Sequence, residues 1–235
     1  EVVGVSDVLL ALPSTKRLRR SEILAELSRH RVHVRSLPNL ADFADGTLQL
    51  SDLKEVDIDD LLGRDIALQV DVNDDLHQGK VILISGAGGS IGSELCRQII
   101  LLNPKKIVLL DHGEFNLYVI EQELSEFIQQ KNLKIDLCPR LASVLDKENL
   151  FSILQAEKVQ IIYHAAAYKH VPLVESNGAA SIKNNVWGTL NLAEVAIELG
   201  VEKFILVSTD KAVRPTNIMG ASKRLAEMVL QELDA

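Results

Sequence analysis

The sequence has 235 residues, of which 47% are hydrophobic and 25% are charged, a balance typical of a globular chain with a substantial core. Its net charge of −8 argues against nucleic acid or an acidic membrane surface as the main partner, so an anionic ligand must be held locally. We find no signal sequence and no apolar run of the roughly 20 residues that span a bilayer, so we expect a soluble chain, and we interpret its compartment as cytoplasmic.

The chain begins at Glu1 without a methionine, and we interpret it as part of a longer protein. Strand-like runs at 8–13 and 32–37 flank a helical pattern at 20–30, which predicts about one βαβ unit. We interpret 1–47 as the C-terminal part of a small Rossmann-like α/β domain, 48–79 as a linker and 80–235 as a second domain. Cys96 and Cys138 lack metal-site spacing, so we expect both to be reduced and buried, and no metal.

From residue 80 onwards, apolar runs alternate with helical stretches. The runs lie at 81–85, 107–111, 135–139, 161–164 and 204–208. This alternation predicts an α/β fold with a doubly wound, Rossmann-like parallel sheet of five strands and helices on both faces. In the helix before the fifth strand, we expect Val186, Leu190, Ala193 and Ile197 to face the core and Gly200 to follow the helix end.

A glycine-rich turn follows the first of these strands, with Gly86, Gly89 and Gly92 spaced three and three. The first glycine permits a tight turn and the middle one lets the backbone approach a pyrophosphate. The last lets the helix pack on the strand, so that its N-terminal amides face the anion. Asp111 ends the next strand, where a carboxylate accepts hydrogen bonds from ribose hydroxyls. The pattern predicts a nicotinamide dinucleotide site.

Asp111 also favours NAD over NADP, because its carboxylate repels a 2′-phosphate and no arginine occurs in residues 112–114. Ser143 and Val144 close the third strand, and we expect them to lie along the adenine. Asp146 is expected to cap the following helix. The remaining expected cofactor contacts lie at the start of the first helix and after the fourth strand: Ser90, Ile91, Ala165 and Ala166.

Further motifs follow the fourth and fifth strands, at the edge of the sheet where ligands bind. They read HAAAYKHVP at 164–172, NNVWGTLN at 184–191, STDKAV at 208–213 and PTNIMGASK at 215–223. Together with the glycine turn, they resemble the extended short-chain dehydrogenase/reductase superfamily. More narrowly, they are similar to its membrane-anchored nucleotide-sugar 4,6-dehydratases of bacterial polysaccharide and capsule synthesis. The resemblance covers most of 80–235.

This resemblance implies NAD as cofactor and a UDP-N-acetylhexosamine as substrate, with UDP-N-acetylglucosamine favoured. It implies a homo-oligomer at the cytosolic face of the inner membrane, with its membrane segments and a substrate lobe outside this chain. The implied reaction is an internal redox cycle. NAD takes hydride from sugar C4, C5–H becomes acidic, water leaves from C6, and the same hydride returns to C6.

By the same resemblance, Asp210 is the acid at the C6 oxygen and Lys211 the base at C5, roles that need pKa values moved toward neutrality. Thr209 would hydrogen-bond the C4 oxygen, and Lys223 would bind the nicotinamide ribose and supply positive charge. Met219 stands where the superfamily usually has tyrosine, and the membrane-anchored branch is similar in having methionine there. A thioether cannot carry a proton, so Asp210 or a water is the candidate base for the C4 hydroxyl.

Several alternatives stay open. The enzyme could be a nucleotide-sugar 4-epimerase or a dehydratase that inverts C5, and a non-catalytic NAD-binding module is the rival from another class. Lys169 and His170 could meet the substrate diphosphate or a neighbouring subunit, or only form the surface of a loop. Asn185 could keep a bent helix or a water relay near the site, or simply cap a helix. Tyr163 and Tyr168 are interpreted as packing residues.

Overall fold

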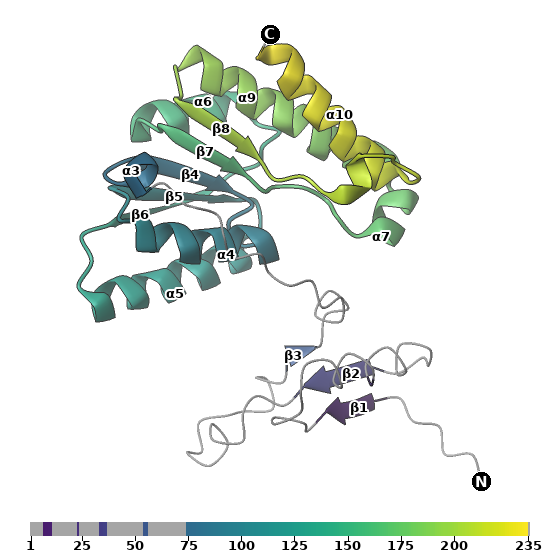
Figure 1. Cartoon of the computed structure of the whole chain (residues 1–235), viewed down its shortest axis with the longest axis horizontal. Coiled ribbons are helices and arrows are strands. Elements are labelled where there is room, and N and C mark those ends of the chain that lie inside the picture. The colour runs from purple at the N-terminus through teal and green to yellow at the C-terminus, as the bar shows by residue number, and fades with distance from the viewer. Residues whose placement is uncertain (1–6, 11–22, 24–32, 37–53, 56–73, 235) are drawn as a thin grey trace. The chain divides into compact units, whose positions relative to one another are not determined.

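The structure is a computed structural model that describes residues 7–10, 23, 33–36, 54–55 and 74–234 (Figure 1). The chain divides into two compact units, Glu1–Val70 and Asp71–Ala235. In the first unit, β1 (Asp7–Leu10) pairs in parallel with β2 (His33–Ser36), and β2 pairs antiparallel with β3 (Lys54–Glu55). No helix within the described ranges is long and apolar enough to cross a membrane.

The parallel pair of β1 and β2 agrees with the strands expected around 8–13 and 32–37. The helix expected at 20–30 lies outside the described residues, apart from the helical Ile23. Both β3 and α3 (Asp74–His77) fall within 48–79, for which the sequence predicted a linker. The division into 1–47, 48–79 and 80–235 stays a prediction.

The second unit is built on five parallel strands in the order β6-β5-β4-β7-β8. This order confirms the predicted doubly wound sheet, because the chain moves outward on one side of β4 and then crosses to the other side. The five strands are β4 (Val81–Ser85), β5 (Lys106–Asp111), β6 (Asp136–Leu141), β7 (Ile161–His164) and β8 (Lys203–Leu206).

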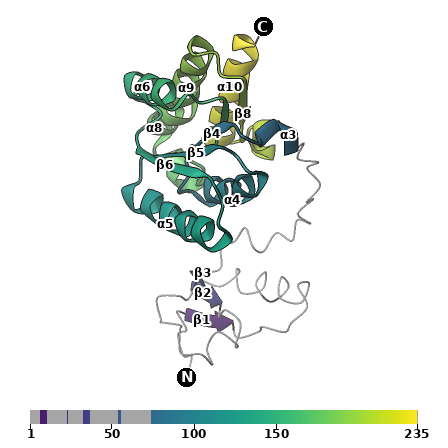
Figure 2. The ribbon, with the colours of Figure 1, turned by 90° about the vertical axis from the view of Figure 1, so that its left-hand side faces the viewer.

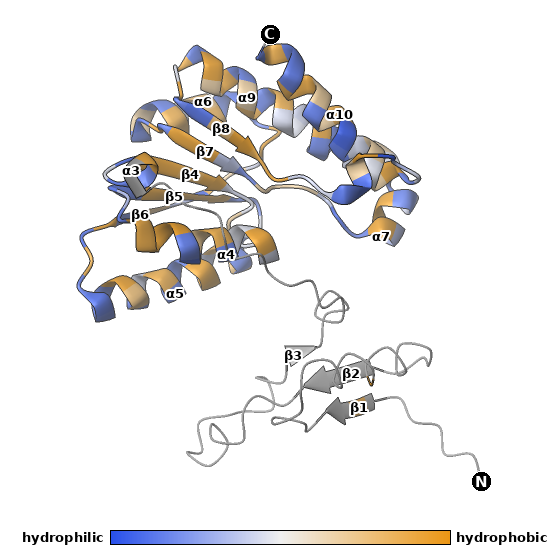
Figure 3. Cartoon of the chain, viewed as in Figure 1, coloured by the Kyte–Doolittle hydropathy of each residue, from blue (hydrophilic) through white to orange (hydrophobic). Residues whose placement is uncertain are grey.

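Helices cover both faces of this sheet (Figure 2). One face carries α4 (Ser90–Ile99), which continues into η3 (Ile100–Leu102), and α5 (Glu114–Lys131); the other carries α6 (Lys147–Glu157) and α9 (Gly188–Glu198). Because side chains alternate along a strand, Ile82 and Ile84 pack toward α4 and α5 while Leu83 packs toward α6 and α9. Hydrophobic colour accordingly runs along the central strands (Figure 3).

The remaining helices lie near the carboxyl edge of the sheet or beside α9. They are α7 (Val171–Ser176), α8 (Gly178–Ile182) and α10 (Ile218–Leu233), and α10 packs against α9. Asp146 caps α6 as predicted, because its carboxylate accepts from the Asn149 amide at 3.1 Å.

The chain enters α9 through a π-helical turn, η4 (Lys183–Trp187). Gly200 follows the helix end with a φ of +68°, as predicted. The predicted core face was wrong at Ile197, which is 58% exposed, whereas Leu192 and Ala196 are buried. Val186 and Ala193 are buried as predicted and Leu190 is half-buried, so only the last position of the predicted stripe lies on the solvent side.

The outer edge of β6 is interrupted near its middle. Pro139 has no amide hydrogen, and its carbonyl oxygen accepts from the Arg140 guanidinium at 3.4 Å. The carboxylate of Glu157 pairs with Arg140 and, at 2.9 Å, with Lys106 on β5; the Lys106 hydrogen bond is the main reason that the pKa of Glu157 is lowered to about 2. The apolar run that predicted this strand ended at Pro139, and β6 continues past it to Leu141 because an edge strand tolerates proline.

Candidate functional site

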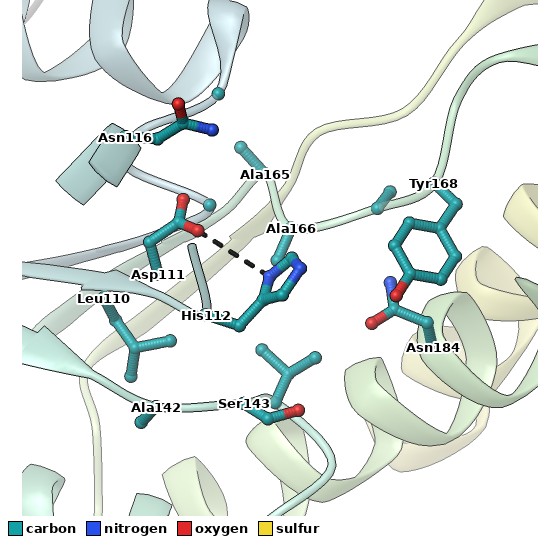
Figure 4. Close-up of a pocket in the computed structure, with 14 residues that line it drawn as sticks. Leu110, Asp111, His112, Asn116, Ala142, Ser143, Ala165, Ala166, Tyr168 and Asn184 are labelled. Atoms are coloured by element: carbon teal, nitrogen blue, oxygen red, sulfur yellow. Dashed lines mark ion pairs between the residues drawn. The ribbon is translucent and has the colours of Figure 1, made fainter. Parts of the chain in front are cut away.

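A pocket of about 150 Å³ lies at the carboxyl ends of β4, β5, β6 and β7 (Figure 4). It sits where the strand order reverses between β4 and β7, which is where doubly wound sheets bind ligands. Seven of the predicted cofactor contacts line it: Gly86, Gly89, Asp111, Ser143, Val144, Ala165 and Ala166. Ser90, Ile91 and Gly92 are not among the lining residues and lie on the first turn of α4. Their contact with a cofactor stays a prediction.

The glycine turn packs too closely for side chains at its first and last glycines. Gly86 has a φ of +69°, and a Cβ there would lie 2.8 Å from the Cα of Ala166 in the loop after β7. A Cβ on Gly92 would overlap the carbonyl oxygen of Gly86. The turn thus brings β4 and the start of α4 together, as the glycine spacing predicted.

The start of α4 suits an anion. The helix begins after Gly89 with no side-chain cap and no acidic residue in its first turn. The ammonium of Lys169 donates to the Ser90 hydroxyl at 2.6 Å, so a positive charge lies at the positive end of the helix dipole. From the sequence, Lys169 could either contact a ligand or only form the surface of a loop. In the structure it lies on the loop after β7, and its ammonium reaches the start of α4, where the pyrophosphate is expected.

Asp111 supports the glycine turn from the end of β5. The residue is 7% exposed, and its carboxylate accepts from the Gly88 amide at 2.9 Å and from the Gly113 amide at 2.8 Å. His112 Nδ1 lies 3.6 Å from the same carboxylate (Figure 4). Each carboxylate oxygen can accept a further hydrogen bond, so the position still fits a ribose hydroxyl.

Four polar residues of the pocket wall were not predicted as site residues: His112, Asn116, Tyr168 and Asn184. The interpretation of Tyr168 as a packing residue was wrong, because it is 43% exposed and its ring meets that of His112 edge-on at 6.4 Å. All but Asn184 lie just after the carboxyl end of a strand, so the rule that places ligands at that edge could have found them. Tyr163 points elsewhere and contacts His77 Nε2 through its hydroxyl at 2.6 Å.

The predicted catalytic residues lie on the segment after β8. Thr209 precedes a short 3₁₀ turn, η5 (Asp210–Ala212); its hydroxyl donates to Asp210 Oδ1 at 3.0 Å and accepts from the Lys211 amide at 3.4 Å. Lys211 Nζ lies 4.0 Å from Asp210 Oδ1, and both side chains are more than half exposed. A carboxylate and an ammonium therefore stand side by side and exposed to solvent.

Helix α10 holds this segment in place. Lys223 donates to the Val207 carbonyl at 2.6 Å, and Ser208 donates to Glu227 at 2.5 Å. The Lys223 side chain is buried, and burial lowers its pKa to about 8 although Glu227 opposes the shift. Met219, one turn before Lys223, is also buried. β8 ends at Leu206 rather than at 208, although the Val207 amide still donates to the His164 carbonyl at 3.0 Å.

Asn185 does not cap a helix. It lies within η4, and its side chain forms hydrogen bonds with the main chain of Tyr168.

Both cysteines are free and buried, and burial raises the pKa of Cys96 to about 12. Across the part of the chain that the structure describes, no group of three or more His, Cys, Asp or Glu side chains could hold a metal ion.

Comparisons with known proteins agree with this architecture. Residues 82–235 match the family described as "Polysaccharide biosynthesis protein". The capsular polysaccharide biosynthesis protein CapD of Staphylococcus aureus is 43% identical over 231 residues, which are 98% of this chain and 38% of that protein. A UDP-N-acetylglucosamine 4,6-dehydratase (inverting) of Campylobacter jejuni is 35% identical over 150 residues, 63% of this chain and 42% of that protein.

Among solved structures, the UDP-Glc/GlcNAc 4-epimerase of Campylobacter jejuni aligns with a TM-score of 0.57 and 27% identity, over 66% of this chain and 49% of that one. The chain thus spans less than half the length of the relatives that it matches. The family match and the CapD relative confirm the resemblance to proteins of bacterial polysaccharide and capsule synthesis. On the strength of residues 82–235 and the CapD relative, the chain belongs to the polysaccharide biosynthesis protein family.

Proposed function

We propose that this chain is the NAD-binding catalytic part of a nucleotide-sugar 4,6-dehydratase. Its substrate is a UDP-N-acetylhexosamine, with UDP-N-acetylglucosamine favoured, and its product is the 4-keto-6-deoxy sugar used in bacterial polysaccharide synthesis. One observation carries the proposal: the glycine turn and the Asp210–Lys211 pair follow strands whose carboxyl ends share one edge of the sheet. The dehydratase name of the 35% identical relative supports it.

The residues that line the pocket suit the phosphate and ribose groups of a dinucleotide. Close packing at Gly86 and Gly92 leaves bare backbone beside the start of α4, where Lys169 adds a positive charge. The Asp111 carboxylate on the wall disfavours a 2′-phosphate, and no arginine is among the described lining residues, which favours NAD over NADP. Bound NAD would accept a hydride from sugar C4 and later return it to C6, so that no net oxidant is consumed.

The chain's own residues move the protons. Thr209 donates to the C4 oxygen, and Asp210 takes the C4 hydroxyl proton directly or through a water, because the Met219 thioether cannot. Lys211 removes the C5 proton, which the C4 ketone has made acidic. Asp210 then protonates the C6 oxygen, which leaves as water. When the hydride returns to C6, C5 takes up a proton from the Lys211 ammonium or from water. Buried Lys223 binds the nicotinamide ribose and supplies a fixed positive charge.

Turnover of UDP-N-acetylglucosamine in deuterated water by the full-length protein tests the reaction. We expect a 4-keto-6-deoxy product that has lost the 6-hydroxyl group and carries deuterium at C5. A product epimeric at C4 with its 6-hydroxyl intact would instead show a 4-epimerase, the activity named for several relatives. The configuration at C5 of the product distinguishes an inverting from a retaining dehydratase.

A non-catalytic NAD-binding module is the rival function. The exposed Asp210–Lys211 pair argues against it, because a scaffold has no need of an acid and a base at its ligand edge. Lys211→Ala in the full-length protein is expected to abolish product formation while NAD binding persists. Unchanged polysaccharide output in cells that carry only this variant would favour the rival.

The proposal extends to the assembly and location of the whole protein. We propose a homo-oligomer at the cytosolic face of the inner membrane, with residues 1–47 as the end of a small Rossmann-like domain and 48–79 as a linker. The resemblance to the membrane-anchored dehydratases supports this arrangement. Light scattering of the purified full-length protein and fractionation of cells test the two parts separately.

A further inference from the structure

Beneath the pocket, a line of buried polar side chains crosses from one strand to the next and into η4. The hydroxyl of Ser85, the residue before Gly86, lies 2.6 Å from His164 Nδ1, and Nε2 of the same imidazole lies 2.9 Å from the Thr189 hydroxyl. Thr189 in turn donates to the Asn185 carbonyl at 2.7 Å. All four residues are essentially inaccessible to solvent.

The hydrogen-bond partners fix where each proton lies. The Asn185 carbonyl can only accept a hydrogen bond, so the Thr189 hydroxyl donates its single proton to it. Toward the imidazole, the same hydroxyl can therefore only accept a hydrogen bond. His164 is therefore protonated at Nε2, and its bare Nδ1 accepts from the Ser85 hydroxyl. A neutral ring agrees with the surroundings, since burial and the charge of Lys223 lower the pKa of His164 to about 3.

At the far end of this line, the Asn185 side chain forms hydrogen bonds with the loop after β7. Its side-chain oxygen accepts from the Tyr168 amide at 2.8 Å, and its side-chain nitrogen donates to the Tyr168 carbonyl at 3.1 Å. The same nitrogen donates at 2.9 Å to Ser222, the residue before Lys223. One amide thus fixes both a wall of the pocket and the helix that carries Lys223.

We propose that His164 is a positioning residue: through Thr189 it holds Asn185 in the π turn, and thereby sets the Tyr168 loop and α10 for cofactor binding. Two features carry the inference. The Asn185 carbonyl is bound by a side chain in a turn whose extra residue departs from regular helix, and π turns are frequent at functional sites. The imidazole is also the link that joins the cofactor strand β4 to that turn.

The proposal rests on the NAD-binding function above, and a pair of variants tests it in the full chain. Thr189→Val keeps the shape but removes the hydroxyl, while Thr189→Ser keeps the hydroxyl. We expect Thr189→Val to weaken NAD binding in calorimetry by about tenfold, the equivalent of one buried hydrogen bond. The Tyr168 amide should exchange hydrogen faster in this variant, and Thr189→Ser should restore both properties.

Ile153→Val is the matched control, because it destabilises the core under α6 without touching the buried line. It is expected to leave NAD affinity and Tyr168 exchange unchanged. If Thr189→Val behaves like this control, the positioning role is wrong and the residues only fill the core.

A second measurement separates this proposal from the proposed function. Nitrogen NMR of the wild-type chain is expected to show His164 as the Nε2–H tautomer at neutral pH. The Nδ1–H tautomer or a charged ring would overturn the hydrogen-bond line even if NAD binds. A wild-type chain that binds no NAD but shows the expected tautomer and Tyr168 exchange would refute the cofactor function and leave the line itself in place.

Discussion

The Asp111 carboxylate accepts a hydrogen bond from the Gly88 amide at 2.9 Å, so the side chain expected to select the cofactor also supports the loop expected to bind it. A second bond, from the Gly113 amide, engages its other oxygen. Cofactor choice and loop stability therefore depend on one residue, and a change at this position should affect both.

Asp111→Asn is expected to weaken NAD binding about tenfold and to lower the preference for NAD over NADP, because the amide removes the charge and points a donor at one of the two backbone amides. Calorimetry with each dinucleotide measures both effects. Asp146→Asn, at the N-cap of α6, is the control and should change neither, since asparagine caps a helix nearly as well. An unchanged NAD preference in Asp111→Asn would contradict this role.

Gly92→Ala should prevent dinucleotide binding. Its Cβ would overlap the Gly86 carbonyl oxygen, which only a shift of the turn or of α4 can relieve. We expect a loss of about 1–3 kcal/mol in the free energy of unfolding, measured by urea denaturation, together with loss of NAD binding. Gly178→Ala is the control, because its Cβ would lie 3.1 Å from the flexible end of Ile218. Normal NAD affinity in Gly92→Ala would exclude a pyrophosphate at this turn.

Lys169 offers a test of the anion site that depends on charge. Removal of its ammonium from the first turn of α4 in Lys169→Ala should lower NAD affinity about threefold to tenfold, and the loss should shrink at high salt. Lys169→Arg is expected to retain most of the affinity. Lys147→Ala removes a lysine paired with Glu194 on the other face of the sheet and should leave NAD binding unchanged. A salt-independent effect of Lys169→Ala would speak for packing instead of charge.

The lowered pKa of Lys223 predicts that the stability of the fold depends on pH. Burial lowers its pKa from 10.5 to about 8, so the unfolded chain binds the extra proton between these values. The free energy of unfolding of the wild type, relative to Lys223→Met, should therefore rise from pH 8 to 10.5 and be flat below pH 8. Urea denaturation at a series of pH values measures the difference. Lys203→Met, which alters an exposed lysine on β8, should give a curve parallel to the wild type.

The sheet could be predicted almost completely from the sequence, because short continuous apolar runs are typical of parallel strands that are buried on both faces. Its ends could not. β6 passes through Pro139 because it is an edge strand, and the segment after β8 is bound through the Val207 carbonyl to Lys223 of α10. Whether a strand lies at an edge, and what the chain after it binds, is decided by neighbours that are distant in the sequence.

The candidate site was predictable where one motif sits on one turn, as at Gly86 and Asp111. It was not predictable where the chemistry depends on contacts between elements. The line from Ser85 through His164 and Thr189 to Asn185 joins β4 and β7 to α9 and the π turn. Tyr168 was misinterpreted for the same reason, since its exposure depends on how Asn185 holds its main chain.

The interrupted edge of β6 bears on how copies of the protein meet. An exposed strand edge is a template on which a second chain can add a strand, and repeated addition leads to aggregates. At Pro139 that edge lacks an amide hydrogen, and its carbonyl oxygen is already bound by Arg140. A continuous ladder of backbone bonds to another molecule cannot form through this point, so the sheet is protected there against growth between molecules.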